Sequence, residues 1–154
     1  MLPLPDVLRA FAGTRNKVNR WVAAGYLTNK VPEGSPGVPS ILDRPTALEI
    51  AFMTVLTDAG RNPSDAKIIA GGWLEKIKKG ERLQTVVLNH FGGAGQNIPT
   101  SSDEPLSVFL DASRLPAEMP MGTEPRPALA IVAVNVTEII RRVDIIDRSY
   151  KVAD

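Results

Sequence analysis

The chain has 154 residues, of which 44% are hydrophobic and 23% are charged, and its formal net charge is +1 at pH 7. This length and apolar content suit one modest domain or a small domain with an appendage, so we expect a folded, soluble protein. The sequence shows neither a run of about 18 apolar residues nor a signal-peptide pattern, which predicts a cytoplasmic protein without a membrane span. The absence of cysteine excludes disulfides, thiolate metal sites and cysteine nucleophiles.

Positive charge is concentrated in the first half of the chain. Residues 1–84 contain 12 Lys and Arg against 8 Asp and Glu, a net of +4, whereas residues 85–154 contain 6 against 9, a net of −3. An excess of positive charge at one end favours an anionic polymer as partner, because neutralising phosphates contributes much of the affinity for nucleic acids.

Two short helices joined by a tight turn are predicted at the N-terminus. Residues 5–12 have apolar side chains at helical spacing, and Gly13 is expected to end this first helix. Thr14 can cap a second helix over residues 14–24, with Gly25 near its end. This arrangement is the helix-turn-helix plan.

A loop and two longer helices are predicted next. Residues 28–43 are rich in proline and glycine, which favours a short ribbon or loop. A third helix should follow and end at Gly60, and a fourth should extend to about residue 79. Each helix has two candidate N-cap residues: Asp43 or Thr46 for the third helix, and Asn62 or Ser64 for the fourth.

The second half of the chain has a different pattern. Strands are predicted over residues 83–91, 105–113 and 127–136, with loops between them such as residues 92–105. A C-terminal amphipathic helix should begin at Thr137 and extend to about residue 150. Its apolar side consists of Ile139, Ile140, Val143 and Ile146. We expect that side to pack either on the sheet of the same chain or on a second copy.

The predicted second helix has a polar outer face. If Val18, Trp21 and Val22 are buried, a turn of about 100° per residue directs the polar side chains to the opposite side. Those side chains are Asn16, Lys17, Asn19 and Arg20. Arginine and asparagine match the base edges of guanine and adenine, and lysine matches phosphate. A solvated helix face is the alternative, but the absence of acidic residues from position 10 to position 32 favours DNA.

An ordered pattern of motifs extends this interpretation. AGTRNKVNRWVAAGYL is followed by the proline- and glycine-rich segment, then by DRPTALEIAFMTVLTDAG, and then by NPSDAKIIAG. In this order and spacing, residues 5–79 resemble the MerR-type winged helix-turn-helix regulators. The resemblance implies binding to operator DNA as a homodimer, with the second helix in the major groove and the wing on the neighbouring backbone or minor groove.

The resemblance also implies a set of DNA-binding residues. These are Thr14, Arg15, Asn16, Lys17, Asn19, Arg20, Lys30 in the wing, and Arg44 at the start of the third helix. The family's wing has an arginine and a tyrosine where this chain has Val38, Pro39 and Ser40. The family also has a long dimerisation helix after the fourth helix. This sequence lacks that pattern, because Gly80 ends the helical periodicity.

Catalysis finds little support in the sequence. The single histidine, His90, lies near a predicted strand end, and the glycine-rich residues 92–97 lack the lysine of a phosphate-binding loop. The acidic residues Asp103, Glu104 and Asp111 lack a metal-site spacing. We therefore expect no enzyme, no cofactor, no metal and no small-molecule effector. Trp21 and Trp73 occupy core positions of their helices, so we expect them to pack in the core instead of stacking on bases.

These observations predict an α+β protein with two parts. Residues 1–80 should form a winged helix-turn-helix DNA-binding domain of about four helices plus a wing at residues 28–42. Residues 81–154 should form a β-rich segment with a C-terminal helix for dimerisation or partner docking. The predicted function is a sequence-specific, double-stranded DNA-binding transcriptional regulator. Two alternatives stay open: an excisionase or architectural DNA-bending protein of a phage or mobile element, and a protein-interaction module such as an antiactivator or packaging subunit.

Overall fold

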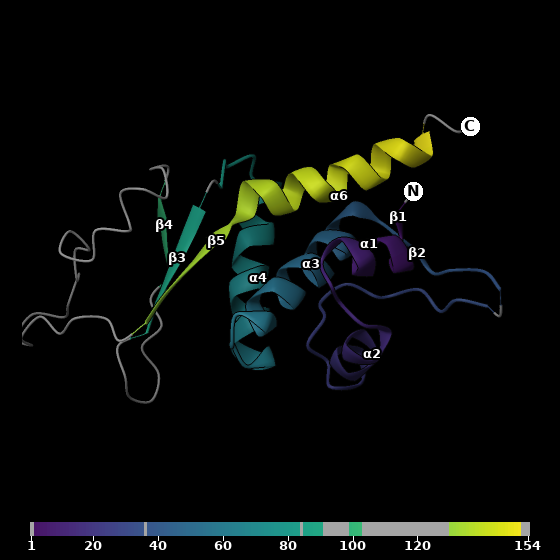
Figure 1. Cartoon of the computed structure of the whole chain (residues 1–154), viewed down its shortest axis with the longest axis horizontal. Helices are drawn as coiled ribbons and strands as arrows, with labels where there is room; N and C mark the ends of the chain where they lie inside the picture. Colours follow the sequence, from purple (N-terminus) through teal and green to yellow (C-terminus); the bar gives the residue numbers. More distant parts are fainter. Residues whose placement is uncertain (1, 36, 84, 91–98, 103–129, 152–154) are drawn as a thin grey trace, which may run out of the picture. The chain divides into compact units, whose positions relative to one another are not determined.

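The computed structural model describes residues 2–35, 37–83, 85–90, 99–102 and 130–151, and combines α-helices with small antiparallel sheets (Figure 1). The chain divides into two compact units. The first unit contains Met1–Glu81 together with Glu138–Asp154, and the second contains Arg82–Thr137. A mixed helical and sheet structure was predicted, and this coarse fold class is confirmed.

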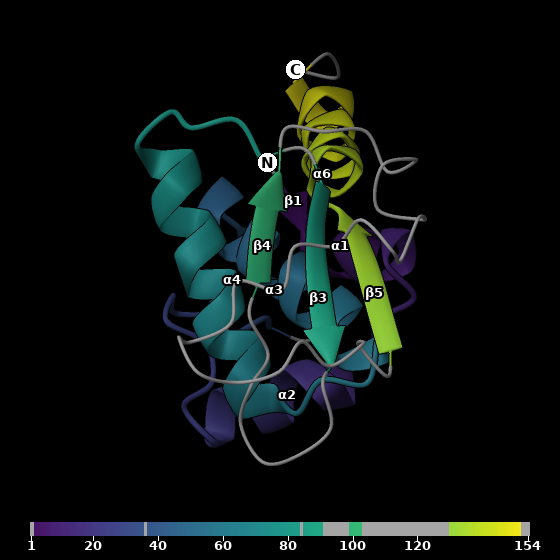
Figure 2. The ribbon, with the colours of Figure 1, turned by 90° about the vertical axis from the view of Figure 1, so that its left-hand side faces the viewer.

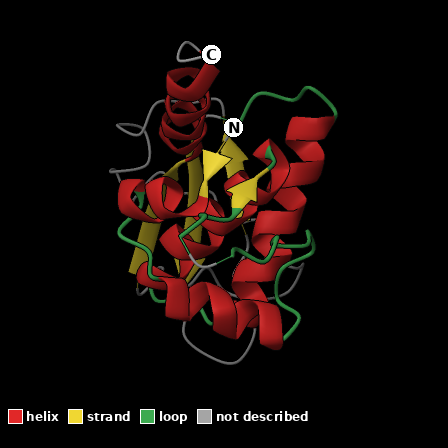
Figure 3. Cartoon of the chain, turned by 90° about the vertical axis from the view of Figure 1, so that its right-hand side faces the viewer, coloured by secondary structure: helices red, strands yellow, loops and turns green. Residues whose placement is uncertain are grey.

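The first unit is built mainly of helices. Its elements are β1 (Leu2–Pro3), α1 (Leu4–Ala10), α2 (Arg15–Ala23), β2 (Ile41–Leu42), α3 (Arg44–Asp58), α4 (Pro63–Lys78) and most of α6 (Val136–Lys151). β1 and β2 form a short antiparallel pair, in which Leu2 lies opposite Leu42 and Pro3 opposite Ile41. Figure 3 looks onto the side of the molecule that carries this pair. A ribbon or loop was predicted over residues 28–43, but a partner strand at the N-terminus was not.

Three helices begin where the sequence offers a capping side chain. Thr14, Asp43 and Asn62 each accept a hydrogen bond from the backbone N–H three residues later, at 3.3, 2.8 and 2.9 Å respectively. The predicted cap of α2 is confirmed, and Asp43 and Asn62 are the caps of α3 and α4. The alternatives, Thr46 and Ser64, lie inside the first turns of these helices.

The helices end on left-handed residues, with one departure from prediction. Gly25 and Gly60 follow α2 and α3 with φ of 68° and 86°, as expected for a C-terminal cap. After α1 the left-handed residue is Ala12, with φ of 54°, whereas Gly13 was predicted to supply the stop. Gly13 serves close packing instead, because a Cβ there would lie 3.0 Å from Leu8 Cδ2 and 3.3 Å from Thr54 Oγ1.

The core of this unit is centred on α3. Ten of its residues are buried, and Phe52 packs edge-to-face against Trp73 of α4 with ring centroids 5.1 Å apart. Val18 and Trp21 attach α2 to this core, and both are buried as predicted. Val22 was also predicted to be buried, but it is 49% exposed. The buried face of α2 is centred between Val18 and Trp21, so Val22 lies at its edge.

The second unit contains a three-stranded antiparallel sheet with β3 (Thr85–His90) between β4 (Pro99–Ser102) and β5 (Ala130–Asn135) (Figure 2). The predicted strands at 83–91 and 127–136 are confirmed as β3 and β5. The assignment of residues 92–105 to a loop is wrong for Pro99–Ser102, which pair with β3. A proline is compatible with this strand, because it is the first residue of an edge strand. The predicted strand at 105–113 lies outside the described residues.

The helix α6 begins one residue earlier than predicted, at Val136, and the Thr137 hydroxyl donates to the Leu83 carbonyl at 3.0 Å. From residue 138 onward it belongs to the helical unit, where Arg142 donates to the carbonyl of Ala10 at 3.3 Å. Ile139 and Val143 are buried. This helix was predicted to belong to the β-rich segment and to pack on the sheet or on a second copy, so its place in the helical unit is a correction.

Candidate nucleic-acid interface

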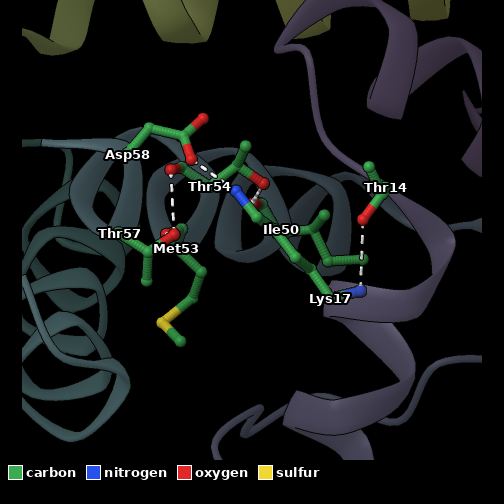
Figure 4. A network of polar contacts seen from close by, with 7 residues as sticks. All are labelled: Thr14, Lys17, Ile50, Met53, Thr54, Thr57 and Asp58. Carbon is green, nitrogen blue, oxygen red and sulfur yellow. Dashed lines mark hydrogen bonds and ion pairs between the residues drawn. The ribbon is translucent and has the colours of Figure 1, made fainter. Parts of the chain in front are cut away.

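The N-terminal end of α2 is held against α3. Lys17 forms an ion pair with Asp58 at the end of α3, and its backbone N–H donates to the Thr14 hydroxyl that caps α2 (Figure 4). On α3, the hydroxyl of Thr54 donates a hydrogen bond to the carbonyl of Ile50 in the same helix, at 2.7 Å. Lys17 therefore contacts α3, and its predicted contact with DNA stays a prediction.

The chain that leaves α2 is held by side chains from α3 and α4. Lys67 of α4 donates to the carbonyl of Gly25 at 2.9 Å. Glu49 of α3 is 2% exposed and accepts hydrogen bonds from the backbone N–H of Thr28 at 2.6 Å and from the backbone and side-chain nitrogens of Asn29, each at 2.9 Å. A buried carboxylate with these donors fixes the start of the predicted wing.

Ser40 connects the other end of that loop to two helices. Its carbonyl accepts from the backbone N–H of Leu4 at 2.8 Å, and its hydroxyl accepts from Arg15 Nη1 at 3.1 Å. The side chain of Ser40 is also close to Gly34, where an added Cβ would lie 3.0 Å from its Oγ. The predicted wing therefore has a direct hydrogen bond to the first residue of α2. Arg15, predicted to contact the DNA backbone, makes this bond.

The outer side of α2 carries an uninterrupted exposed stripe. Asn16, Asn19, Arg20 and Ala23 are all exposed and follow the i, i+3, i+4, i+7 spacing of one helix face. Residues Arg15–Ala23 include no acidic side chain. One surface of α2 therefore carries side chains that can hydrogen-bond to base edges, together with the small side chain of Ala23.

The remaining two predicted residues lie in different surroundings. Lys30 is exposed in the loop after α2. Arg44 begins α3 and forms a two-point ion pair with Asp144 of α6, with Nε–Oδ1 at 2.7 Å and Nη2–Oδ2 at 3.2 Å. The hydrogen bond with Asp144 raises the pKa of Arg44 above its ordinary value. Arg44 was predicted as an additional phosphate contact, and its planar donor face is occupied by this carboxylate.

Sequence reasoning missed three residues that hold the surface in place: Ser40, Glu49 and Lys67. Only Glu49 had a visible signal, because it stands alone as a charged residue within the apolar run ALEIAFM. An isolated charge in such a run predicts a buried, hydrogen-bonded group, since an unpaired one would be too costly to bury.

Two other features were sought among the described residues, a metal site and a membrane-spanning helix. Those residues contain no group of three or more His, Asp or Glu side chains placed to hold a metal ion. No described helix combines the length and the apolar character that a membrane span needs. Comparison with protein-family models finds none that matches this chain, and comparison with curated proteins finds no match either.

Proposed function

We propose that this protein is a sequence-specific, double-stranded DNA-binding transcriptional regulator whose first unit acts as a MerR-type winged helix-turn-helix. In this proposal α2 enters the major groove and residues 28–42 form the wing. The observation that carries it is the exposed stripe of α2, free of acidic side chains, on a helix fixed at both ends. The ion pair between Lys17 and Asp58 and the hydrogen bond from Lys67 to the Gly25 carbonyl connect the two ends of that helix to α3 and α4, and base recognition requires a supported helix.

Each residue of the stripe has a role in this proposal. Arg20 offers the two donors that match the O6 and N7 of guanine, and Asn16 and Asn19 offer the donor and acceptor that match adenine. Ala23 leaves space for the methyl group of thymine. Lys30 supplies a phosphate contact from the wing, which orients the protein without reading the sequence.

The proposal includes a homodimer. A single helix reads few base pairs, and two copies double the contacts and fix the spacing of half-sites at about 34–36 Å or its multiples. The unit Arg82–Thr137 is then available for dimerisation or for docking another protein.

The test begins with a duplex selected from a random pool by the wild-type protein. On that duplex Arg20→Ala and Asn16→Ala should each weaken binding by about 1–3 kcal/mol, or roughly 5- to 150-fold in Kd. Lys78→Ala is the matched control, because it removes one positive charge from an exposed side chain of α4. Lys78→Ala should change Kd by less than about twofold, because substitutions of surface residues outside an interface have small effects on free energy.

Three outcomes would contradict the proposal. One is failure of the wild-type protein to select or bind any duplex, which is also what a protein-interaction module predicts. Another is unchanged binding by both α2 variants. The third is an equal loss for Lys78→Ala and Arg20→Ala, which would indicate charge attraction without a recognition helix.

A further inference from the structure

The helix α6 is attached to the helical unit along one side. Its residues Ile139 and Val143 are buried, and Asp144 forms the two-point ion pair with Arg44 at the start of α3. Because side chains point outward all round a helix, the side of α6 away from these contacts faces solvent. The contacts on the inner side give that outer side a fixed position on the unit.

The outer side of α6 carries one apolar residue among arginines. Ile145 is 48% exposed. Helical spacings of three and four residues place Arg141 and Arg142 next to it on the N-terminal side, and Arg148 on the C-terminal side. All three arginines are exposed. We call these four residues the α6 face.

The α6 face has an excess of positive charge. Glu138 accepts hydrogen bonds from both Arg141 and Arg142, so one carboxylate is shared by two guanidinium groups. Among the described residues, no carboxylate forms an ion pair with Arg148. The two aspartates of α6 are engaged in other ion pairs. The arginines are therefore available for charge-assisted hydrogen bonds with carboxylates of a partner.

A second copy of the chain does not match this face. In an antiparallel pair of helices centred on Ile145, Arg142 of one copy would lie opposite Arg148 of the other. A parallel pair would place each arginine opposite its own counterpart. Both arrangements bring like charges together, which is unfavourable.

The α6 face and the exposed stripe of α2 lie at opposite ends of the helical unit, as the two views in Figure 1 and Figure 2 agree in showing. The ion pairs are consistent with this separation, because α6 is joined to Arg44 and α2 to Asp58, the first and last residues of α3. At a rise of 1.5 Å per residue these two positions are about 21 Å apart. A duplex bound to α2 therefore leaves the α6 face open to another ligand.

We propose that the α6 face binds an acidic peptide segment of a partner protein. An apolar side chain of the peptide packs on Ile145. One carboxylate of the peptide binds Arg148, and another binds Arg141 or Arg142. A peptide is favoured over a nucleic acid because an apolar side chain occupies the middle of the face and the carboxylate of Glu138 lies between two of its cations.

The spacing of the arginines predicts the spacing of the acidic residues. Arg148 lies six and seven positions after Arg142 and Arg141, so their backbones are about 9–11 Å apart along the helix. An extended peptide advances about 3.3 Å per residue, and acidic residues three positions apart match this distance. The proposal concerns a different surface from that of α2 and does not require DNA binding.

The experiment selects peptides from a displayed library of short random sequences, with the full-length protein as the target. The Kd of a synthetic copy of an enriched peptide is then measured by fluorescence polarisation. The test variants are Arg148→Glu and Ile145→Ser. Their matched controls are Lys79→Glu, at an exposed lysine that ends α4, and Ile68→Ser, at an α4 residue that is 72% exposed. Circular dichroism checks the fold of all four variants.

We expect the enriched peptides to carry acidic residues on both sides of an apolar residue. Arg148→Glu should weaken binding by about 10-fold or more, because repulsion replaces an attraction. Ile145→Ser should weaken it by about 5-fold through lost apolar contact, and both controls should change Kd by less than about twofold. Binding should weaken as salt is added. The protein bound to its selected duplex should take the peptide with an unchanged Kd.

Several outcomes would overturn the inference. These are failure to select any peptide, selection of peptides without acidic residues, and equal Kd values for Arg148→Glu and Lys79→Glu. A random duplex or an anionic vesicle that binds more tightly than the peptide, and loses that binding in Arg148→Glu, would assign the face to another class of ligand. A changed sedimentation coefficient of Arg148→Glu would show that a second copy covers the face.

The variant Arg20→Ala separates this inference from the proposed function. Arg20 lies on α2, so its substitution should weaken binding to the duplex and leave binding to the peptide unchanged. Competition between the peptide and the selected duplex for the wild-type protein would contradict the placement of the two surfaces and overturn the inference. Peptide binding without any duplex binding would support the inference and contradict the proposed function alone.

Discussion

Glu49 provides the most direct test of how the candidate interface is held. The carboxylate is buried on α3 and accepts three hydrogen bonds from Thr28 and Asn29. Glu49→Ala removes all three acceptor contacts and leaves two backbone N–H groups without a partner. At about 1.5–3 kcal/mol for each hydrogen bond to a charged group, the gross loss is roughly 4–9 kcal/mol.

Two effects reduce the net loss. The substitution also removes a buried charge, whose desolvation costs several kcal/mol. In addition, Thr28 is exposed, so water can reach part of the released backbone. We therefore expect Glu49→Ala to lower the free energy of unfolding by about 3 kcal/mol, which is within the range for breaking a buried charged contact. For a unit of this size, Tm should fall by roughly 12–24 °C.

Urea unfolding and hydrogen exchange together measure this effect. The amides of Thr28 and Asn29 should lose their protection in Glu49→Ala, while amides in the middle of α3 should keep theirs until global unfolding. Asn29→Ala, which removes only one of the three bonds, should cost about 1.5 kcal/mol, the lower end of the range for a hydrogen bond to a charged group. Glu75→Gln, at a surface carboxylate of α4, is the control and should change stability by less than about 0.5 kcal/mol. The reasoning is refuted if Glu49→Ala is as stable as this control and both amides remain protected.

Three further substitutions or titrations test other parts of the helical unit. Ala12→Gly should raise the free energy of unfolding by about 0.5–1 kcal/mol in thermal melts, because glycine relieves the left-handed backbone; lower stability would contradict this. A double-mutant cycle on Arg44 and Asp144 should give a coupling of about 0.5–1 kcal/mol, discounted because both side chains are partly exposed, and zero coupling would show that the pair does not anchor α6. Hydrogen bonds from Arg141 and its neighbour lower the pKa of Glu138 from 4.5 to about 2. The contribution of ionised Glu138 to folding stability should therefore be complete above pH 4.5 and be lost as pH falls through about 2. An NMR titration of the Glu138 carboxyl with a midpoint near 4.5 would contradict this prediction.

Local sequence signals predicted the elements around the candidate interface. Thr14 was predicted as the cap of α2, and Asp43 and Asn62 were each one of two candidates, because a capping side chain bonds to an N–H only three residues away. The outward orientation of Asn16 and Arg20 followed from helical geometry in the same way. Such features depend on neighbours along the chain and therefore need no knowledge of tertiary contacts.

Long-range contacts were not predictable by the same reasoning. Lys17 was expected on the outer face, but its partner Asp58 lies 41 residues later in the sequence. Arg44 was expected to be available for phosphate, and its partner is 100 residues away. The strand β4 depends on pairing with β3, because Pro99–Ser102 have no strong β-propensity of their own. In each case the tertiary partner decides the structure, and periodicity does not identify that partner.

The placement of α6 has a consequence for the architecture of the chain. Since Glu138–Asp154 belong with Met1–Glu81, the intervening unit is an insertion, and the chain leaves and re-enters the helical unit at neighbouring points marked by the bond between Thr137 and Leu83. An insertion with adjacent ends can be exchanged for a short linker or for a different module without separating the C-terminal helix from its host. The helical unit can thus be combined with a different inserted unit by a single replacement within the gene.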